Sequence, residues 1–222
     1  KAQTSLPVPE VYHCSEQIIV MEWIDGVPGV LSARAERDLA RHVASLHDIT
    51  ASAFGFEWDT VIGPLNQPNV AMTGWPSFFA ECRLMHMARL AVEAGQLPGA
   101  MMARIERLVA CIHDELDHDP EPSLLHGDLW GGNILVRDDQ IAGFIDPAIY
   151  FGDAEVELAF MTLFDTVGRD FFTAYRERRS IASGFEERRR DVYLLYPLLV
   201  HVRLFGGSYT GQIAAILNRL GY

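Results

Sequence analysis

The residues of this chain best suited to chemistry lie in one stretch, residues 124–146, and they carry oxygen ligands. Asp128 lies in a glycine-rich loop that ends at Asn133, and Asp146 follows two apolar, β-branched runs split by a polar turn. Such runs predict a β-hairpin. Because the two ends of an antiparallel hairpin lie together, Asn133 and Asp146 should be neighbours, with Asp128 close by. Carboxylate and amide oxygens are the ligands that Mg²⁺ takes alongside water and substrate phosphates.

The spacing of these residues matches the catalytic loop of a protein kinase. Asn133 follows Asp128 by five positions, and Asp146 closes the predicted hairpin. In kinases the first Asp accepts the proton of the substrate hydroxyl, and the Asn and the second Asp hold the metal ions. His126 precedes Asp128 with one glycine between them, where kinases carry His-Arg-Asp. A structural hairpin with a few loop carboxylates is the alternative, but the four residues together favour a phosphotransferase.

Composition limits the class of partner. The 222 residues are enough for one domain with a sizeable core or for two small lobes, and 49% are hydrophobic. A formal net charge of −12 argues against a nucleic acid or an anionic membrane as the main partner. No apolar run approaches the roughly 20 residues of a membrane span. The three cysteines, Cys14, Cys82 and Cys111, suggest neither a disulfide framework nor a zinc site, so a cytoplasmic location is expected.

Helices are predicted to supply most of the structure that positions the loop. A second hairpin is expected at 11–14 and 17–21, and Ser32 is suited to cap a helix at 33–48. Segment 51–74, rich in Gly, Pro and Asn, is predicted to be a long loop. Further helices are predicted at 75–94, 100–117, 154–166, 170–178, 186–205 and 209–220.

Two other sets of polar residues are expected to be structural. The charged run 186–190 is interpreted as a solvated face of a helix. His42 and His47 are interpreted as packed or capping residues, because no carboxylate cluster at metal-ligand spacing accompanies them.

Several stretches of the chain resemble the fructosamine kinase (ketosamine-3-kinase) family, a branch of the protein-kinase-like fold near the aminoglycoside phosphotransferases and choline kinases. The matching stretches are HGDLWGGN at 126–133, DPAIYFGD at 146–153, WPSFFAECRL at 75–84, GF at 55–56 and FGGSY at 205–209. Trp130 inside the catalytic loop, together with Pro-Ala-x-Tyr-x-Gly-Asp, narrows the resemblance to ketosamine kinases.

This resemblance implies an α+β, mostly α fold: a protein-kinase-like C-terminal lobe with the last hairpin of the N-terminal lobe. Residues 1–24 would be the remnant of the small-lobe hairpin and hinge, and residues 25–222 the helical large lobe. The family's glycine-rich phosphate loop and its lysine would precede this hairpin, but the only lysine of the chain is Lys1. The 222 residues alone are therefore expected to be inactive. The family usually carries Arg where this chain has Ala154, so a salt bridge and some local rigidity should be lost.

The resemblance also implies a role for each residue of the loop. The enzyme would be an ATP-dependent, Mg²⁺-dependent kinase that phosphorylates a sugar hydroxyl of a ketosamine, either a small molecule or a glycated lysine on a protein. Asp128 would be the catalytic base, and Asn133 and Asp146 would bind Mg²⁺. Trp130 would offer a flat face to the substrate, and His126 would lie beside the substrate and brace the loop.

The remaining expectations concern the nucleotide, the assembly and the rival functions. Met21, Glu22 and Ile24 occupy the place where a kinase hinge meets adenine through backbone groups. A monomer is favoured for the intact enzyme. One rival is an aminoglycoside or choline kinase, which would favour acidic pocket residues over Trp130. Another is a truncated, inactive protein that binds a nucleotide or a partner. A third, a metal-dependent hydrolase using His126 with the two aspartates, would need more ligands nearby.

Overall fold

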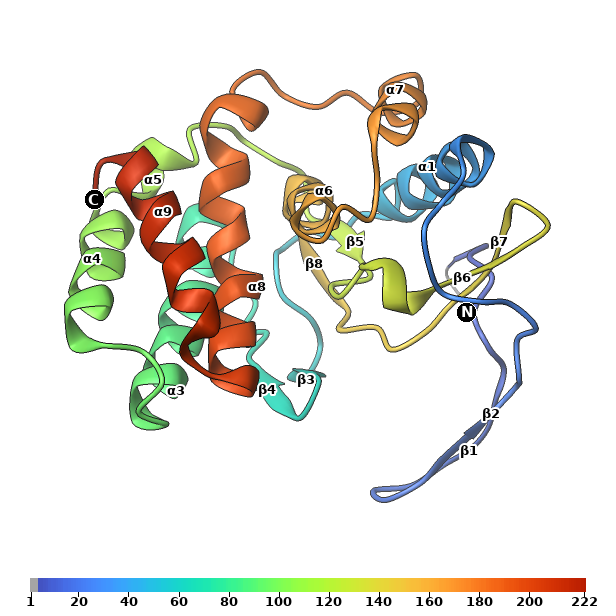
Figure 1. Ribbon diagram of the computed structural model, residues 1–222, viewed down its shortest axis with the longest axis horizontal. Coiled ribbons are helices and arrows are strands. Elements are labelled where there is room, and N and C mark those ends of the chain that lie inside the picture. Colours follow the sequence, from blue (N-terminus) through green and yellow to red (C-terminus); the bar gives the residue numbers. More distant parts are fainter. Residues whose placement is uncertain (1–3) are drawn as a thin grey trace.

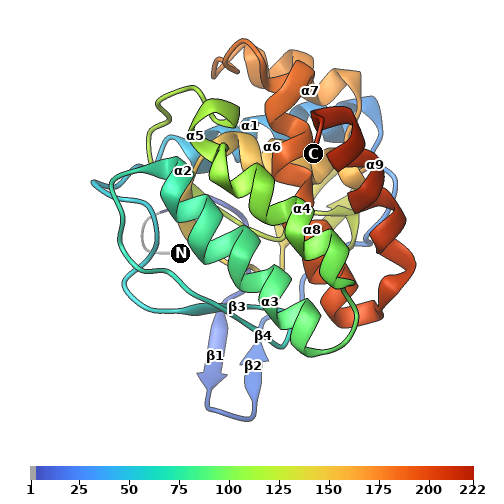
Figure 2. The same ribbon diagram turned by 90° about the vertical axis from the view of Figure 1, so that its left-hand side faces the viewer.

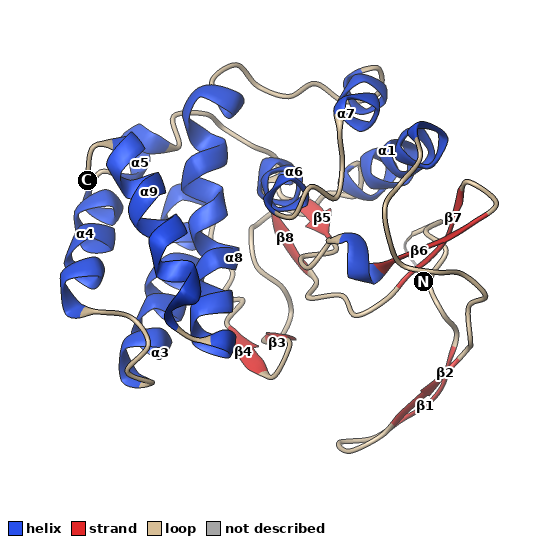
Figure 3. Cartoon of the chain, in the orientation of Figure 1, coloured by secondary structure: helices blue, strands red, loops and turns tan. Residues whose placement is uncertain are grey.

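The computed structural model describes residues 4–222, and helices make up most of that part of the chain (Figures 1 and 3). Within it the strands pair two by two into four short antiparallel sheets rather than one large sheet. The mostly helical α+β architecture predicted from the sequence is confirmed. Residues 1–3, and with them Lys1 and the start of the predicted segment 1–24, lie outside the described residues. None of the helices in residues 4–222 combines the length and apolar character that crossing a bilayer requires.

The predicted N-terminal hairpin is present and projects from the rest of the chain (Figures 1 and 2). Strands β1 (Val11–Cys14) and β2 (Ile19–Met21) pair antiparallel, with Cys14 opposite Ile19. Every residue of both strands is exposed. A two-stranded ribbon on its own is marginally stable in water, so these strands depend on contacts beyond their own pairing.

The chain that leaves β2 lies along the hairpin predicted to carry the metal ligands. We call this hairpin the metal-site hairpin after the predicted ligands Asn133 and Asp146, and it consists of β6 (Ile134–Arg137) and β7 (Gln140–Phe144). Val27 and Val136 exchange two backbone hydrogen bonds of 2.9 Å, so Val27 extends the ladder by one bridge. Ile24 lies so close over Gly143 that a Cβ there would be 2.4 Å from its side chain. Residues 24–27 are therefore fixed to the metal-site hairpin.

The first long helix, α1 (Ala33–His47), begins where the sequence predicts. Ser32 caps it, because its side chain accepts a hydrogen bond from the Ala35 N–H. The buried face of the helix, which includes Leu39 and Val43, packs against β7 and against α7 (Arg169–Arg176). This helix thereby supports the metal-site hairpin from one side.

The prediction that 51–74 is a long loop is wrong in part. The segment contains a third hairpin, β3 (Thr60–Ile62) and β4 (Leu65–Gln67). Each strand has only three residues, and Asn66 and Gln67 break the apolar alternation that would have revealed them. Gln67 is buried: its amide donates to the Ala148 carbonyl at 3.0 Å and its oxygen accepts from the Tyr196 hydroxyl at 2.7 Å. The hairpin is thereby tied to the segment after β7.

Most of the remaining elements lie where the sequence predicts, but the helix predicted at 100–117 is interrupted at Cys111, and the strand at Tyr150–Gly152 was not predicted. The remaining elements are α2 (Trp75–Phe78), a π-helical segment (Phe79–Met85), α3 (His86–Glu93), α4 (Gly99–Ala110), α5 (Ile112–Glu115), β5 (Ser123–Leu125), β8 (Tyr150–Gly152), α6 (Ala154–Leu163), a second π-helical segment (Phe185–Arg189), α8 (Arg190–Phe205) and α9 (Thr210–Leu220). Strands β5 and β8 pair with each other, with Leu124 opposite Phe151. The segment between them, residues 126–149, contains the candidate catalytic loop and is called the catalytic segment. This pairing brings both ends of that segment together.

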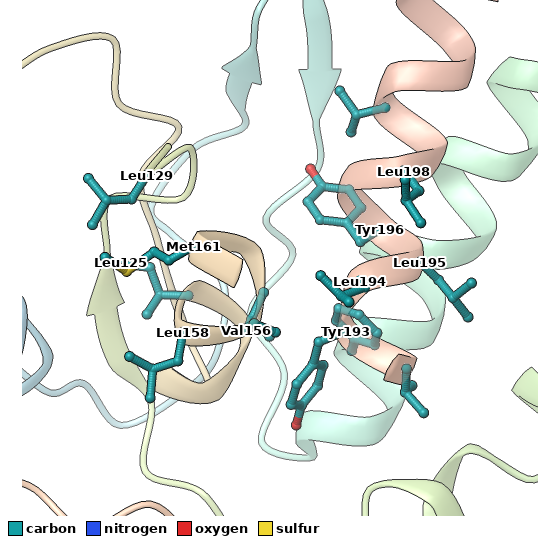
Figure 4. Packing of buried hydrophobic residues seen from close by; sticks show 14 of the residues in the cluster. Leu125, Leu129, Val156, Leu158, Met161, Tyr193, Leu194, Leu195, Tyr196 and Leu198 are labelled. Atoms are coloured by element: carbon teal, nitrogen blue, oxygen red, sulfur yellow. The ribbon is translucent and has the colours of Figure 1, made fainter. Parts of the chain in front are cut away.

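Helices α6 and α8 form the centre of the core. Helix α8 packs against α3, α6 and α9, and its residues 192–200 are all buried. Figure 4 shows Tyr193 and Tyr196 of α8 on one side of α6, and Leu125 of β5 and Leu129 of the candidate catalytic loop on the other. A rigid core of this kind holds the catalytic loop against α6.

The interpretation of 186–190 as a solvated helix face holds for Glu186, Glu187 and Arg188, which are exposed, but it is wrong for Arg189. Arg189 is only 2% exposed, and its guanidinium donates to both carboxylate oxygens of Glu155, at 2.7 and 2.9 Å. A buried arginine is compatible with the fold because this fork-to-fork pairing satisfies its donors. Glu155 directly follows Ala154, the position where the family usually carries Arg. Arg189, the last residue of the π-helical segment before α8, thus supplies an ion pair at the place where the sequence predicts a loss of rigidity.

Candidate active site

The metal-site hairpin brings its two ends together as predicted. Ile134 pairs with Phe144, and just beyond them the Ile145 N–H donates to the Asn133 carbonyl at 3.1 Å. Asp146 comes next, and its φ of 52° lies in the left-handed region. Aspartate adopts this conformation at some energetic cost, and such residues concentrate at functional sites. This backbone turn places Asp146 directly after the strand, one residue beyond the hydrogen bond to Asn133.

Asn133 and Asp128 are joined by hydrogen bonds. The Asn133 side-chain amide donates to the Asp128 backbone carbonyl at 2.8 Å and to its carboxylate Oδ2 at 3.0 Å. These bonds fix the rotamer of the asparagine and the direction of the aspartate. They also use only the N–H₂ end of the asparagine, which leaves its amide oxygen available as a ligand.

The environment of Asp128 makes it a stronger base than an ordinary aspartate. Burial raises the pKa of its carboxyl to about 6, against the hydrogen bond from Asn133. The negative charges of Asp146 and Glu157 act in the same direction as burial. A carboxylate with a pKa near the working pH is suited to accept a proton from a hydroxyl.

This pKa predicts a pH-dependent gain in stability for Asp128→Asn. The folded protein holds the Asp128 proton more tightly than the unfolded chain, so the ionised group costs stability above about pH 6. The cost shrinks as the pH falls from 6 towards 4. In the absence of divalent cations, the variant should gain at most about 3 kcal/mol in free energy of unfolding at pH 7.5.

Urea denaturation of parent and variant at pH 7.5 and pH 4 measures this difference. The gain should be present at the higher pH and nearly absent at the lower one. An equal gain at both values would show that ionisation of Asp128 is not its cause.

The site contains a buried carboxylate that sequence analysis missed. Glu157 of α6 accepts hydrogen bonds from the backbone N–H groups of His126 (3.3 Å) and Gly127 (2.7 Å), and from the ring of His47 at 3.0 Å. Burial opposes its ionisation, but the hydrogen bond from His47 and the nearby charges outweigh burial and hold its pKa below the ordinary value. His47 is in turn hydrogen-bonded to the Tyr175 hydroxyl at 2.8 Å. This chain of bonds fixes the start of the catalytic loop to α1, α6 and α7.

A signal for Glu157 was present in the sequence. It is one of two glutamates in the otherwise apolar segment 154–163, and a charged residue there needs a buried partner. The partner is the backbone of a loop 30 residues earlier, which no helical spacing can reveal. The expectation that His47 is a packed residue is confirmed, since it is fully buried.

His126 braces the loop. Its ring Nε2 lies 3.0 Å from the Ile145 carbonyl, and its Nδ1 accepts from the Asp128 N–H at 3.3 Å. Burial lowers the pKa of the imidazole, against the nearby negative charges, so the ring is neutral near pH 7. Both ring nitrogens are therefore engaged with the backbone, one on each side of the site.

Gly127 is the position of the loop with the least room. Its φ is +83°, and a Cβ added there would lie 2.1 Å from the Ala148 carbonyl oxygen. Gly127→Ala is therefore expected to lower the free energy of unfolding by about 2–5 kcal/mol, from backbone strain and steric overlap.

Chemical denaturation of this variant beside Gly211→Ala tests the expectation. Gly211 lies in α9, and a Cβ there meets no heavy atom within 4 Å. That control should be neutral or more stable by up to about 1 kcal/mol. A Gly127→Ala protein as stable as the control would contradict the geometry.

Trp130 lies at the surface of the loop and is 43% exposed. Its indole packs against Gly132, where a Cβ would be 2.3 Å from the ring. The Gly131 N–H donates to the Thr166 hydroxyl at 3.0 Å, which fixes the loop to the segment after α6. The glycines thus make room for the ring and hold it in one place, with one edge near Phe164.

The three residues proposed for the hinge lie between the N-terminal hairpin and the metal-site hairpin. Met21 ends β2 and is exposed, and the Glu22 N–H donates to the Glu10 carbonyl at 2.8 Å. Ile24 is packed on Gly143 of β7. Their backbone therefore connects the projecting hairpin to the strand that leads to Asp146.

A model of a known family matches almost the whole chain. The family described as fructosamine kinase covers residues 1–221. The chain belongs to the fructosamine kinase family. The resemblance seen in the sequence is thereby confirmed.

Curated relatives in this family are named as ketoamine kinases. The chain is 36% identical over 222 residues to "Probable ketoamine kinase YniA" of Escherichia coli K12, covering 97% of this chain and 75% of the relative. It is 34% identical over 221 residues to "Probable ketoamine kinase slr1563" of Synechocystis, covering 96% and 70%. The fructosamine kinase family member described here therefore spans about three quarters of the length of these relatives.

Solved structures agree on the fold. The "putative fructosamine-3-kinase" of Thermobifida fusca superimposes with a TM-score of 0.89 at 32% identity, covering 98% of this chain and 74% of that one. The ADP-bound aminoglycoside phosphotransferase APH(2'')-Ib superimposes with a TM-score of 0.60 at 17% identity, covering 98% and 76%. The second match shows a shared fold alone.

The residues expected to bind Mg²⁺ in this family member fit such an ion by their chemistry. Asn133 offers a free amide oxygen beside the Asp128 carboxylate. Asp146 is exposed, and within residues 4–222 its carboxylate takes part in no hydrogen bond or ion pair, so its oxygens are available. Hard oxygen donors of this kind, with positions left for water and phosphate, suit Mg²⁺.

A second cluster of possible metal ligands has a structural role instead. His118, Asp153 and Glu155 could bring one atom each to within 4.8 Å of one another. Asp153 is already bonded to the His118 ring at 2.7 Å and to the Tyr193 hydroxyl, and it caps α6 through the Glu155 N–H. Glu155 is paired with Arg189. The carboxylates therefore already have hydrogen-bond or ion-pair partners within the protein, and the cluster ties the segment after α5 to α6 and α8.

Proposed function

We propose that this protein is the catalytic part of an ATP-dependent kinase that phosphorylates a sugar hydroxyl of ketosamines. The observation that carries the proposal is the Asp128–Asn133 pair at the open end of the β6–β7 hairpin. Membership of the fructosamine kinase family supports the substrate class, because the curated relatives are named as ketoamine kinases. Both free ketosamines and glycated lysines on proteins belong to this class.

Asp128 acts on the substrate hydroxyl in this proposal. Its carboxylate accepts a hydrogen bond from the hydroxyl, orients the oxygen for attack and takes the proton as the bond to phosphorus forms. Asn133 holds the carboxylate in position, and Glu157 and His126 hold the backbone on either side. Asn133 and Asp146 would hold Mg²⁺, which supplies charge neutralisation on the phosphates.

We assign the nucleotide to the surface next to the metal-site hairpin. We assign adenine to the backbone of Met21, Glu22 and Ile24, which runs beside the metal-site hairpin. Residues 1–24 would then belong to a small lobe and residues 25–222 to the large lobe. ADP bound to an aminoglycoside phosphotransferase of the same fold supports a nucleotide as co-substrate.

Trp130 favours a ketosamine over an aminoglycoside as the acceptor. An exposed indole in the same loop as the proposed base offers a sugar ring and its amine an apolar face and a cation–π partner. The hydrolase alternative has little support, because both nitrogens of His126 are engaged with the backbone and are not free to bind a metal.

Mass spectrometry of fructosyl-lysine and ribulosyl-lysine tests the proposal. The protein used is an extended form, defined as residues 1–222 preceded by a family small lobe that carries a glycine-rich loop and a lysine. With Mg-ATP each accepted substrate should gain one phosphate. Phosphorylation of kanamycin or choline, with both ketosamines untouched, would overturn the assignment.

A further inference from the structure

A row of aromatic side chains continues from Trp130 along the surface to the end of α8. We call it the aromatic strip, and its other members are Phe164, His201, Phe205 and Tyr209. Phe164 follows α6, His201 and Phe205 lie in the last turns of α8, and Tyr209 precedes α9. Helices α6 and α8 pack against each other, and their C-terminal ends lead into the strip.

The members of the strip are in contact with one another from end to end. The rings of Trp130 and Phe164 are 6.3 Å apart in an edge-to-face arrangement. The Phe164 ring lies 5.0 Å from the His201 ring. His201 in turn lies 5.5 Å from Phe205 and 5.0 Å from Tyr209. These separations are those of stabilising aromatic pairs, so the strip is one continuous surface that starts two residues after Asp128.

The strip remains open to solvent along much of its length. Phe205 is 65% exposed, and Phe164 is also exposed. The core of this protein already buries most of its other phenylalanines, so hydrophobic burial within the chain does not explain their position. Contiguous exposed apolar surface that adjoins a polar site is typical of a binding surface.

His201 adds a neutral polar group to this surface. Its Nδ1 lies 2.7 Å from the Pro197 carbonyl, which accepts the N–H of the ring. The other ring nitrogen is then a hydrogen-bond acceptor. Neutral aromatic faces with one acceptor suit a group that is apolar and carries an amine.

We propose that the aromatic strip binds the amine-derived part of the ketosamine, and that it favours adducts of aromatic amines. This inference rests on the proposed function, which places the sugar hydroxyl at Asp128 and the sugar-amine junction on Trp130. The substituent on nitrogen then extends past Trp130, where Phe164 and Phe205 continue the apolar surface. The strip thereby sets which amine adducts are accepted, while Asp128 sets which hydroxyl reacts.

Calorimetric binding of two ketosamines to the 222-residue chain tests the strip. Both carry the same fructose-derived sugar, one as the adduct of methylamine and the other of benzylamine. The benzylamine adduct should bind about tenfold more tightly, because an aromatic ring on the strip adds both buried area and ring pairing. Phe205→Ala should reduce this advantage to about threefold or less and leave the affinity for the methylamine adduct unchanged.

Tyr12→Ala is the matched control. Tyr12 is 63% exposed, close to the 65% of Phe205, but it lies on the hairpin that projects away from α8 (Figure 1). It should leave the preference for the benzylamine adduct intact. Unchanged affinity for the methylamine adduct also shows that each variant retains a folded site.

The possible outcomes distinguish a failure of the strip assignment from a failure of the proposed ketosamine site. If both adducts bind the parent chain equally, or if Phe205→Ala preserves the preference, the assignment of the strip is wrong while the ketosamine site stands. If neither adduct binds, the ketosamine site itself is wrong, and the strip assignment is overturned with it.

Discussion

In the extended form of the enzyme, Asp128→Asn is expected to lower kcat by about 10²–10⁴-fold and to leave the affinity for ATP close to that of the parent. The asparagine keeps the shape of the side chain and can still accept the hydrogen bond from Asn133. It cannot take a proton from the substrate hydroxyl. The loss should therefore appear in the chemical step rather than in nucleotide binding.

Asp146→Asn is the matched variant, since it makes the same chemical change at the other carboxylate of the hairpin. It should weaken Mg-ATP binding itself, because Asp146 is assigned to the metal. Steady-state kinetics with both substrates varied, together with ATP binding by calorimetry, distinguish the two effects. Full turnover by Asp128→Asn would show that the base is another group.

The 222-residue chain by itself is expected to show little or no kinase activity. Its only lysine is Lys1, and its sequence contains no glycine-rich hairpin before β1 that could cover a triphosphate. Losing a single donor to developing negative charge costs about 3–4 kcal/mol in enzymes that depend on such donors. Losing the whole set should exceed what Asp128 and a metal ion can supply.

The same chain is expected to self-associate through its N-terminal hairpin. Val11, Ile18 and Val20 are all exposed, and β1 and β2 pair only with each other in the described residues. Open strand edges and apolar faces favour pairing with a second chain. A coupled assay for ADP release and light scattering on the same sample measure both properties. Ketosamine-dependent turnover by a chain that stays monomeric would contradict both the expected inactivity and the expected self-association.

A substitution on the hairpin separates the two effects. Val20→Lys places a charge on the exposed face of β2 and should reduce the scattering of the 222-residue chain. It should not restore activity, because it supplies no group at the phosphates. Recovery of turnover with the monomer would show that association, rather than missing phosphate contacts, suppresses the activity.

The sequence by itself determined the local structure of the candidate catalytic loop and indicated the residues proposed for its chemistry. Asp128, Asn133 and Asp146 could be identified from residue type and spacing, because a hairpin and a short loop are local structures. The cap of α1 at Ser32 and the hairpin of β6 and β7 were equally local, and both are confirmed.

Only the tertiary structure decided what holds that loop in place. Glu157 accepts hydrogen bonds from the backbone N–H groups of His126 and Gly127, which are 30 or more residues earlier in the sequence. Arg189, just before α8, donates a hydrogen bond to Glu155. Spacing rules describe neighbours along one helix or strand, and they are silent about partners that packing brings together. The aromatic strip was hidden for the same reason: Trp130, Phe164 and Phe205 become one surface only because α6 and α8 pack side by side.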